Sequence, residues 1–274
     1  MIELKAYAKI NLALEVMEKE NGYHKVNNLM IPIDLYDVLT FKKAEGIVVE
    51  DDPFNGDNII FKAAKLFFER TKINGGVYIT LKKNIPVAAG LAGGSSDAAT
   101  TLKGLNMLYD AKLSNEELVE MSALLGSDVG FFIANKISLC TGRGEIINPL
   151  DIDIPKLNIF LVKPSFGLST ALVYKNYKYL GVSKKDKLNN IIQALKNKDV
   201  EKLKKNIFND LEQTALEVEK KLKKAYDRLV DLGCHPYLSG SGPTMFLIDP
   251  TMEEILTIQS KSSKDIYLKL TNTF

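Results

Sequence analysis

The chain has 274 residues, of which 46% are hydrophobic and 26% charged, as in a globular protein of one large domain or two modest ones. Its formal net charge of only +2 at pH 7 disfavours a general binder of polyanions. No apolar run approaches the roughly 18 residues of a membrane span, and the start of the chain has no signal-peptide pattern. The two cysteines are far apart and form no zinc pattern, so a cytoplasmic protein is expected.

The first predicted strand carries two polar side chains on one face. Apolar residues alternate over positions 10–16, and this alternation places Lys9 and Asn11 together on the opposite face. Such a pair is either solvated or lines a site that needs a cation beside an amide. A turn follows with Tyr23 and His24, which offer a stacking ring and hydrogen-bonding nitrogens, although a lone histidine near a turn is commonly a surface residue.

The next segments predict a strand, a corner and a helix. Residues 29–41 favour strand structure with a corner at 35–37. Apolar residues at helical spacing over 59–68 predict a helix with one buried face, and Asp57 is a plausible cap for it.

A loop of small residues between a strand and a helix dominates the middle of the chain. Residues 86–99 read PVAAGLAGGSSDAA, after an alternating strand at 77–81 and before a helix expected over 98–108. Glycine lets the backbone approach a ligand, and a helix start offers unpaired N–H groups, so this segment predicts a phosphate cradle. Ser95 or Ser96 is expected to cap the helix, contact a phosphate or reach a phosphate-bound metal. The alternative is a loop that only connects two elements.

The amino-acid sequence of this loop differs from three well-known phosphate-binding motifs and excludes them. A P-loop needs lysine and then serine or threonine after its last glycine, whereas Ser-Ser-Asp follows here. The dinucleotide pattern Gly-x-Gly-x-x-Gly is absent as well. The glycine-rich loop of protein kinases lies in a hairpin, whereas a helix is expected here.

A single aspartate stands between two glycines after the next predicted helix. Ser114 and Glu117 form a capping-box pattern for a helix that ends near Gly126. Asp128 then precedes the apolar run Val-Gly-Phe-Phe-Ile, which makes it a candidate acid–base group. The alternative is a turn aspartate that caps the next element. A strand at 137–141 and a bend at 142–145 follow.

The second half begins after a polar connector at 151–155, so we predict domains at 1–153 and 154–274. Residues 169–171 are expected to cap a helix. The lysine-rich stretch 175–224 is interpreted as a solvated helical surface rather than a nucleic-acid face, because it contains no arginine. A second glycine–serine loop, at 239–244, precedes a strand at 245–248 and either forms an anion-binding nest or presses against the first loop.

Three segments in this order resemble the three motifs of the GHMP kinase superfamily: Lys9-Ile10-Asn11, the loop 86–99 and the loop 239–244. One family of this superfamily phosphorylates the 2-hydroxyl of 4-diphosphocytidyl-2-C-methyl-D-erythritol in the non-mevalonate isoprenoid pathway. Its motifs are similar to residues 22–24, 35–37 and 126–132 of this chain. The resemblance implies a two-domain α+β fold, with an N-terminal domain like domain 2 of ribosomal protein S5 and a ferredoxin-like C-terminal domain. It also implies ATP and Mg²⁺ as cofactors.

The same resemblance assigns the site residues. Lys9 and Asp128 match the catalytic pair. ATP is expected to contact Pro86, Val87, Ala88, Ala89, Gly90, Leu91, Ala92, Gly93, Gly94, Ser95 and Ser96 and, by a looser match, Asn58 and Lys83. The substrate is expected to contact Asn11, Tyr23, His24, Thr170, Tyr174, Gly240 and Ser241. Alanine at 88, 89 and 92 departs from the glycine that many relatives carry, which should leave the loop less freedom.

Two alternatives remain at this point. One is a GHMP kinase for mevalonate or homoserine, and the other is a nucleic-acid-binding protein that uses the lysine-rich half. Tyr23 and His24 favour a cytidine-bearing substrate, because mevalonate and homoserine have no base to recognise. The expected partner is therefore a small molecule and neither a nucleic acid nor a membrane, and the protein is expected to be a monomer or a weak homodimer.

Overall fold

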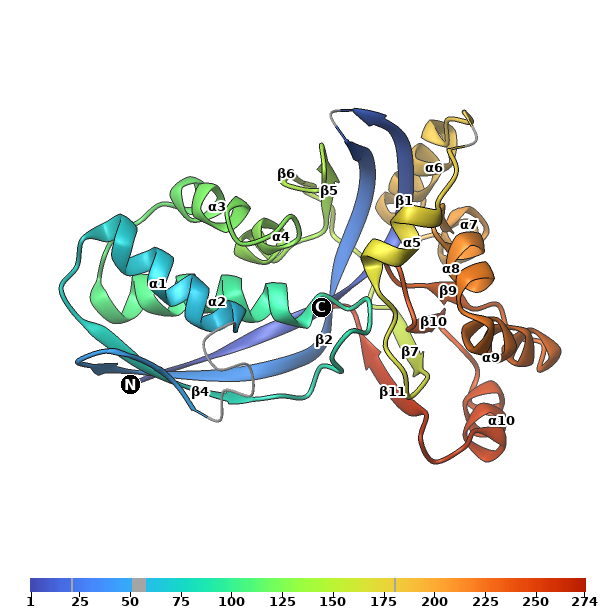
Figure 1. The fold of residues 1–274 in the computed structure, drawn as a ribbon. Coiled ribbons are helices and arrows are strands. Elements are labelled where there is room, and N and C mark those ends of the chain that lie inside the picture. The colour runs from blue at the N-terminus through green and yellow to red at the C-terminus, as the bar shows by residue number, and fades with distance from the viewer. Residues whose placement is uncertain (21, 51–57, 180) are drawn as a thin grey trace.

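A long antiparallel hairpin is the backbone of the fold in this computed structural model, which describes residues 1–20, 22–50, 58–179 and 181–274. Its strands are β1 (Ile2–Glu20) and β2 (Tyr23–Ala44) (Figure 1). Their register shifts between Tyr7 and Ala8, where Asp34 and Leu35 form a bulge. The predicted corner at 35–37 is therefore wrong, because β2 continues through it.

The larger sheet has the order β3-β4-β2-β1-β8, and β5 and β6 extend it from β2. Its shorter strands are β3 (Ile47–Val49), β4 (Gly76–Lys82), β5 (Ser138–Thr141), β6 (Ile146–Pro149) and β8 (Phe208–Asn209). The helices α1 (Ile59–Thr71), α2 (Gly93–Tyr109), α3 (Asn115–Ala123) and α4 (Val129–Ala134) lie over one face of it (Figure 1). Buried rings of Phe41, Phe67 and Phe131 fill the space between helices and sheet.

Local capping explains where two of these helices begin. Asn58 caps α1, since its side chain accepts a hydrogen bond from the Ile60 N–H at 2.9 Å. Asp57, the predicted cap, lies outside the described residues. The capping box of Ser114 and Glu117 is confirmed at the start of α3.

The smaller sheet has the order β11-β7-β10-β9. Its strands are β7 (Asn158–Lys163), β9 (Tyr237–Leu238), β10 (Met245–Ile248) and β11 (Tyr267–Asn272). The helices of this half are α5 (Thr170–Asn176), α6 (Lys185–Lys196), α7 (Val200–Asn206), α8 (Glu212–Val218), α9 (Lys220–Asp231) and α10 (Met252–Lys261). The chain passes between the two sheets after Pro149 and before Asn158. The predicted domain boundary falls in this connector and stays a prediction.

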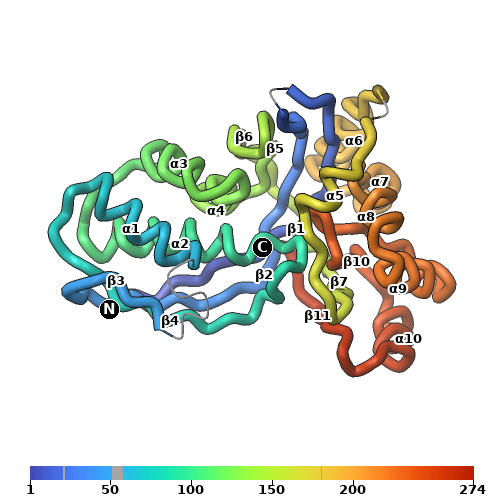
Figure 2. The backbone as a smooth tube through the Cα atoms, viewed as in Figure 1, coloured from blue at the N-terminus to red at the C-terminus, as the bar shows by residue number. Residues whose placement is uncertain are grey.

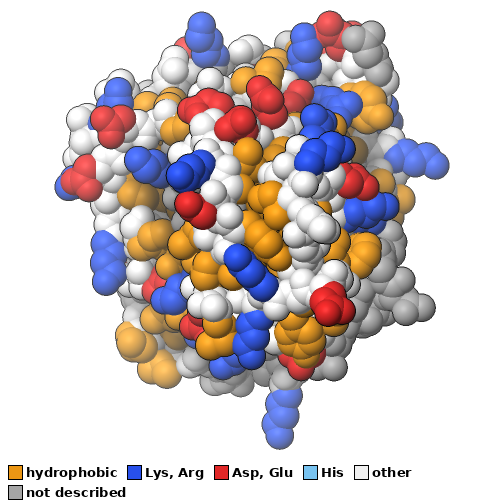
Figure 3. Space-filling view, turned by 90° about the vertical axis from the view of Figure 1, so that its left-hand side faces the viewer, with side chains coloured by type: hydrophobic (Ala, Val, Ile, Leu, Met, Phe, Trp, Pro, Cys, Tyr) orange, Lys and Arg blue, Asp and Glu red, His pale blue; other side chains and the backbone are white. Residues whose placement is uncertain are grey.

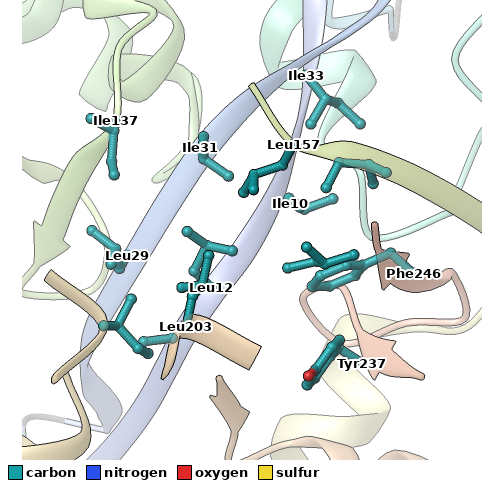
Figure 4. Close-up of a cluster of buried hydrophobic side chains, with 14 of the residues drawn as sticks. Ile10, Leu12, Leu29, Ile31, Ile33, Ile137, Leu157, Leu203, Tyr237 and Phe246 are labelled. Atoms are coloured by element: carbon teal, nitrogen blue, oxygen red, sulfur yellow. The ribbon is translucent and has the colours of Figure 1, made fainter. Parts of the chain in front are cut away.

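The two halves share a hydrophobic core. Ile10 and Leu12 of β1 contribute to one buried cluster with Leu203, Tyr237 and Phe246 of the second half (Figure 4). Strand β8, a break in the predicted helical stretch, also pairs in parallel with β1 of the first sheet. The two halves are therefore held together across the hairpin.

The C-terminus returns to the junction of the two sheets. Thr273 forms an isolated bridge with Ile33 of β2, and the chain end lies at the centre of the molecule in Figure 2. The Thr273 hydroxyl accepts a hydrogen bond from the Leu157 N–H at 2.9 Å, which ties the end of the chain to the start of β7.

The surface carries both signs of charge. On the face shown in Figure 3, lysine or arginine and acidic side chains are interspersed around a hydrophobic band. Within the described ranges, no helix has both the length and the apolar composition that crossing a membrane requires.

Candidate active site

The predicted phosphate loop leads directly into helix α2. The helix begins at Gly93, before the predicted start at 98, and its N-cap is Ala92 in the left-handed conformation, with φ at 54° and no side-chain cap. Ser95 and Ser96 lie in the first turn, so the expectation that one of them caps the helix is wrong. The first N–H groups of a helix lack intrahelical partners, which suits them to bind an anion.

A cavity of about 1260 Å³ lies against this loop. Residues from both halves of the chain line it, and they include nearly every residue that the sequence analysis predicted for the site. The exceptions are Leu91 and Ser96, whose side chains are buried beside the loop. A large concave site with converging polar groups is typical of a small-molecule enzyme.

The second glycine–serine loop presses against the first. The Ser239 hydroxyl donates to the Gly90 carbonyl oxygen at 3.0 Å, and the Thr244 N–H donates to the Ala89 carbonyl oxygen at 3.3 Å. Of the two roles predicted for this loop, contact with the first loop is confirmed. The predicted phosphate loop is thus held in place by hydrogen bonds from the second half of the chain.

Lys9 joins β1, the phosphate loop and the start of α4. Its ammonium donates to Asn11 Oδ1 at 2.8 Å and to the Gly90 carbonyl oxygen at 3.0 Å, and it lies 4.0 Å from Asp128 Oδ2. Asn11 in turn donates to Asn28 Oδ1 at 2.6 Å, which fixes the orientation of its amide. Burial lowers the Lys9 pKa, and the negative charge of Asp128 opposes that effect. Strand alternation thus brings Lys9 and Asn11 into the cavity rather than into solvent.

Asp128 occupies the N-cap position of α4 without capping it. Its side chain accepts no capping hydrogen bond, lines the cavity and is 34% exposed. Val129 and Phe131 are buried behind it. The alternative of a purely structural turn aspartate is therefore disfavoured, and the carboxylate is open to a ligand.

The far end of the cavity contains His24 and aromatic rings. His24 Nδ1 lies 2.6 Å from the Met17 carbonyl oxygen and must donate to it, because a carbonyl only accepts. Nε2 is then left as an acceptor, and within the described residues it is buried with no partner. The His24 ring lies 6.1 Å from Tyr174 and 5.4 Å from Tyr177, while Tyr23 is 58% exposed. His24, Tyr23 and Tyr174 therefore form one part of the cavity, called the aromatic recess below, with ring faces and a polar imidazole edge.

Helix α5 borders the same recess. Ser169 caps it as predicted, accepting from the Leu172 N–H at 3.3 Å. The Thr170 and Ser241 hydroxyls lie 2.7 Å apart, so the helix is linked to the second glycine–serine loop. Tyr174, one turn later, is partly buried, and this burial raises its pKa, so its hydroxyl stays protonated.

Lys83 is held by two buried carboxylates beside the start of α2. Its ammonium lies 2.5 Å from Asp37 Oδ2 and 2.7 Å from Asp97 Oδ2. Burial raises the Asp97 pKa to about 7. The Lys83 ammonium opposes this rise, but it is shared with Asp37, whose negative charge raises the Asp97 pKa further. For Lys83 the two carboxylates outweigh burial and raise its pKa. This cluster braces the cradle, because a Cβ on Gly93 would lie 3.0 Å from Lys83 Nζ.

The raised Asp97 pKa predicts a pH dependence of stability. An unfolded aspartate loses its proton near pH 4, whereas folded Asp97 keeps it to about pH 7, so stability falls as pH rises between these values. We expect the free energy of unfolding to drop by about 2 kcal/mol from about pH 5.5 to about pH 7 through this group. Asp97→Asn should flatten that slope in urea denaturation at a series of pH values. Equal slopes for the two proteins would contradict the assignment.

Among the cavity-lining residues that the sequence interpretation did not assign to the site are Asn28, Asp97 and Arg143. Asn28 faces Asn11 across the hairpin, which depends on strand register, and Asp97 was interpreted only as part of the loop 86–99. Arg143 lies in the bend between β5 and β6, with its guanidinium carbon 4.4 Å from the centre of the Tyr23 ring. The flanking glycines signalled the bend but not what it approaches.

The family models match both halves of the chain. GHMP kinases N terminal domain covers residues 58–136, and GHMP kinases C terminal covers residues 191–264. The structure of homoserine kinase from Cytophaga hutchinsonii has the same fold, with a TM-score of 0.70 at 17% identity over 99% of this chain and 95% of that one. The fold and the paired loops around the cavity define a GHMP kinase.

Relatives narrow the class further. The chain is 39% identical to 4-diphosphocytidyl-2-C-methyl-D-erythritol kinase of Clostridium botulinum (strain Kyoto / Type A2), over 98% of this chain and 99% of that protein. The same-named protein of Lachnoclostridium phytofermentans is 39% identical, over 90% and 88% of the two chains. A crystal structure of 4-(cytidine 5'-diphospho)-2C-methyl-D-erythritol kinase superposes with a TM-score of 0.81 at 29% identity, covering 100% of both chains.

The chain belongs to the 4-diphosphocytidyl-2-C-methyl-D-erythritol kinase family. The predicted family and the two-domain α+β GHMP kinase fold are confirmed. Structures of mevalonate and homoserine kinases share the fold at 16–17% identity, so this family is favoured over those alternatives.

Proposed function

We propose that this chain uses ATP to phosphorylate the 2-hydroxyl of 4-diphosphocytidyl-2-C-methyl-D-erythritol, a step of the non-mevalonate isoprenoid precursor pathway. The observation that carries the proposal is one cavity lined by the first glycine–serine loop, by buried Lys9 with partly exposed Asp128, and by His24, whose Nε2 has no partner among the described residues. These features suit a triphosphate, an acceptor alcohol and a nucleobase in turn.

The chemical step uses Asp128 and Lys9. Asp128 accepts the proton of the substrate hydroxyl, or orients that hydroxyl, as its oxygen bonds to the γ-phosphorus and the bond to the leaving ADP oxygen breaks. The Lys9 ammonium, 4.0 Å from Asp128 Oδ2, offsets the negative charge that develops during the transfer. The first N–H groups of α2 hold the triphosphate in line for this transfer.

Mg²⁺ is part of this proposal. Within the described residues, no group of three or more His, Cys, Asp or Glu side chains could hold a metal by itself. Mg²⁺ in kinases binds largely through phosphates and water, with few protein oxygens. The Ser95 hydroxyl, which lines the cavity in the first turn of α2, fits as one of them. When bound, the ion supplies charge neutralisation on the phosphates.

His24 is proposed to recognise the cytosine. Its Nε2 is an acceptor with no partner among the described residues, and the exocyclic amino group of cytosine is a donor. We expect His24→Ala to raise the KM for the cytidine substrate about tenfold, the worth of one hydrogen bond in a desolvated site, while kcat changes little. Steady-state kinetics at saturating ATP measures this. An unchanged KM would dismiss the base-reading role.

An ADP-release assay with a panel of alcohols tests the function itself. ADP release with 4-diphosphocytidyl-2-C-methyl-D-erythritol, and not with mevalonate or homoserine, is the expected result. Preferred turnover of mevalonate or homoserine would overturn the proposal. A salt-sensitive shift on RNA with no ATP turnover would favour the nucleic-acid alternative instead.

Three further expectations stay predictions. A monomer or weak homodimer, a cytoplasmic location and the lack of nucleic-acid binding rest on composition and charge. Sedimentation and the RNA assay above address the first and the last.

A further inference from the structure

Arg143 stands apart from the other arginines of the chain. The chain has three, Arg70, Arg143 and Arg228, and of these only Arg143 lines the cavity. In the described part of the chain its guanidinium forms no ion pair with a carboxylate and lies on the Tyr23 ring. Its positive charge is therefore available to an anionic ligand.

The bend that carries Arg143 lies between the part of β2 next to His24 and the carboxylate of Asp128. The Gly142 carbonyl oxygen accepts from the Val26 N–H at 2.8 Å, two residues along β2 from His24. On the other side, a Cβ on Gly144 would lie 3.8 Å from Asp128 Oδ1. The Arg143 N–H donates to Glu145 Oε2 at 2.6 Å, which closes the bend. Arg143 thus sits between the recess for the base and the carboxylate for the alcohol.

The proposed substrate has two phosphates at the corresponding place, because its diphosphate joins the nucleoside to the alcohol. A guanidinium can stack through its face and donate through its edge at the same time, so contact with Tyr23 leaves its N–H groups free for phosphate oxygens. We propose that Arg143 binds the diphosphate of the nucleotide-linked substrate while stacked on Tyr23. This inference rests on the proposed function and names the ligand of one more side chain of the same site.

The alternative role is structural, in which Arg143 only holds the Tyr23 ring in place. Cytidine and CDP separate the two roles, because they share the base and differ in the diphosphate. We would measure the affinity of each by calorimetry in the presence of saturating ADP, which occupies the ATP site. The proteins are wild type, Arg143→Ala, Arg143→Lys and Arg70→Ala, whose residue lies outside the cavity lining.

We expect Arg143→Ala to weaken CDP at least tenfold, as the loss of a charge-assisted contact does, and to change cytidine by less than about twofold. Arg143→Lys should fall between, because it keeps the charge and loses the fork, and Arg70→Ala should match wild type. With the full substrate, KM should rise while kcat and the KM for ATP hold.

Two results would overturn the proposal. Equal losses for cytidine and CDP would make Arg143 a support for Tyr23 alone, and unchanged affinity for both would remove it from the site. Wild-type protein that neither binds CDP nor releases ADP with the cytidine substrate would instead refute the proposed function. If the wild type is active and Arg143→Ala binds CDP as tightly as the wild type does, only the role of Arg143 is refuted.

Discussion

Asp128→Asn is expected to lower kcat about 10³-fold while the affinity for ATP changes little. The amide has nearly the same shape but cannot accept the proton of the substrate hydroxyl. It also removes the anion 4.0 Å from Lys9 Nζ, so the charges around the acceptor oxygen change. The phosphate loop keeps its own contacts, because Lys9 still donates to the Gly90 carbonyl oxygen. Single-turnover kinetics together with nucleotide titration separates these effects.

Asp153→Asn is the matched control, because that carboxylate is 87% exposed and outside the cavity lining. It should keep wild-type turnover. Full activity of Asp128→Asn would remove Asp128 from the chemistry. A loss of ATP affinity as large as the loss of kcat would make it a binding residue instead.

Period-two alternation and loop composition predicted the parts of the site that depend on local structure. Lys9 and Asn11 share a strand face whatever that strand packs against, and a glycine–serine loop before a helix predicts an anion site by itself. The distance between Lys9 and Asp128 is different in kind, since it depends on how β1 and α4 pack. The sequence resemblance pointed to this pair, and the fold brings it together.

The start of α2 shows where local propensity failed. Two glycines at the beginning of a helix are unfavourable on propensity alone, so the prediction placed the start later. The loop instead turns at Ala88 and Ala92, with φ of 50° and 54°, conformations that glycine adopts more readily. Packing of the two glycine–serine loops fixes this backbone, and the residues of the first loop alone do not encode its conformation. Asn28 and Arg143 were missed for the same reason, because each enters the site only through tertiary packing.

The same two alanines bear on how firmly the cradle is held. A left-handed alanine costs about 1 kcal/mol relative to glycine, and the folded loop must offset that cost through its contacts. These contacts are hydrogen bonds that the Ser239 hydroxyl and the Thr244 N–H, both from the second half of the chain, donate to carbonyl oxygens of the loop. The backbone of the predicted phosphate loop is therefore set by the junction of the two halves rather than by its own sequence.

Gly90→Ala tests this junction and should have the largest effect on stability. Gly90 has φ of 75°, and an added Cβ would lie 2.2 Å from the Ser239 carbonyl oxygen, a backbone atom that cannot move alone. Strain at the positive φ together with overpacking should lower the free energy of unfolding by about 3 kcal/mol. Urea denaturation measures this loss.

Turnover should fall as well, by about 10²-fold, because separating the loops shifts the Gly90 carbonyl that Lys9 holds and with it the position of Lys9 beside Asp128. Gly94→Ala is the control for stability: its Cβ would meet only Ile59 Cγ2, at 3.8 Å, so helix propensity should leave the protein as stable as wild type or up to about 1 kcal/mol more stable. Equal stability of Gly90→Ala and wild type would contradict the tight contact between the loops. A stability loss with unchanged turnover would mean that Lys9 keeps its place without the Gly90 carbonyl, and the cradle and the catalytic pair would then be independent of each other.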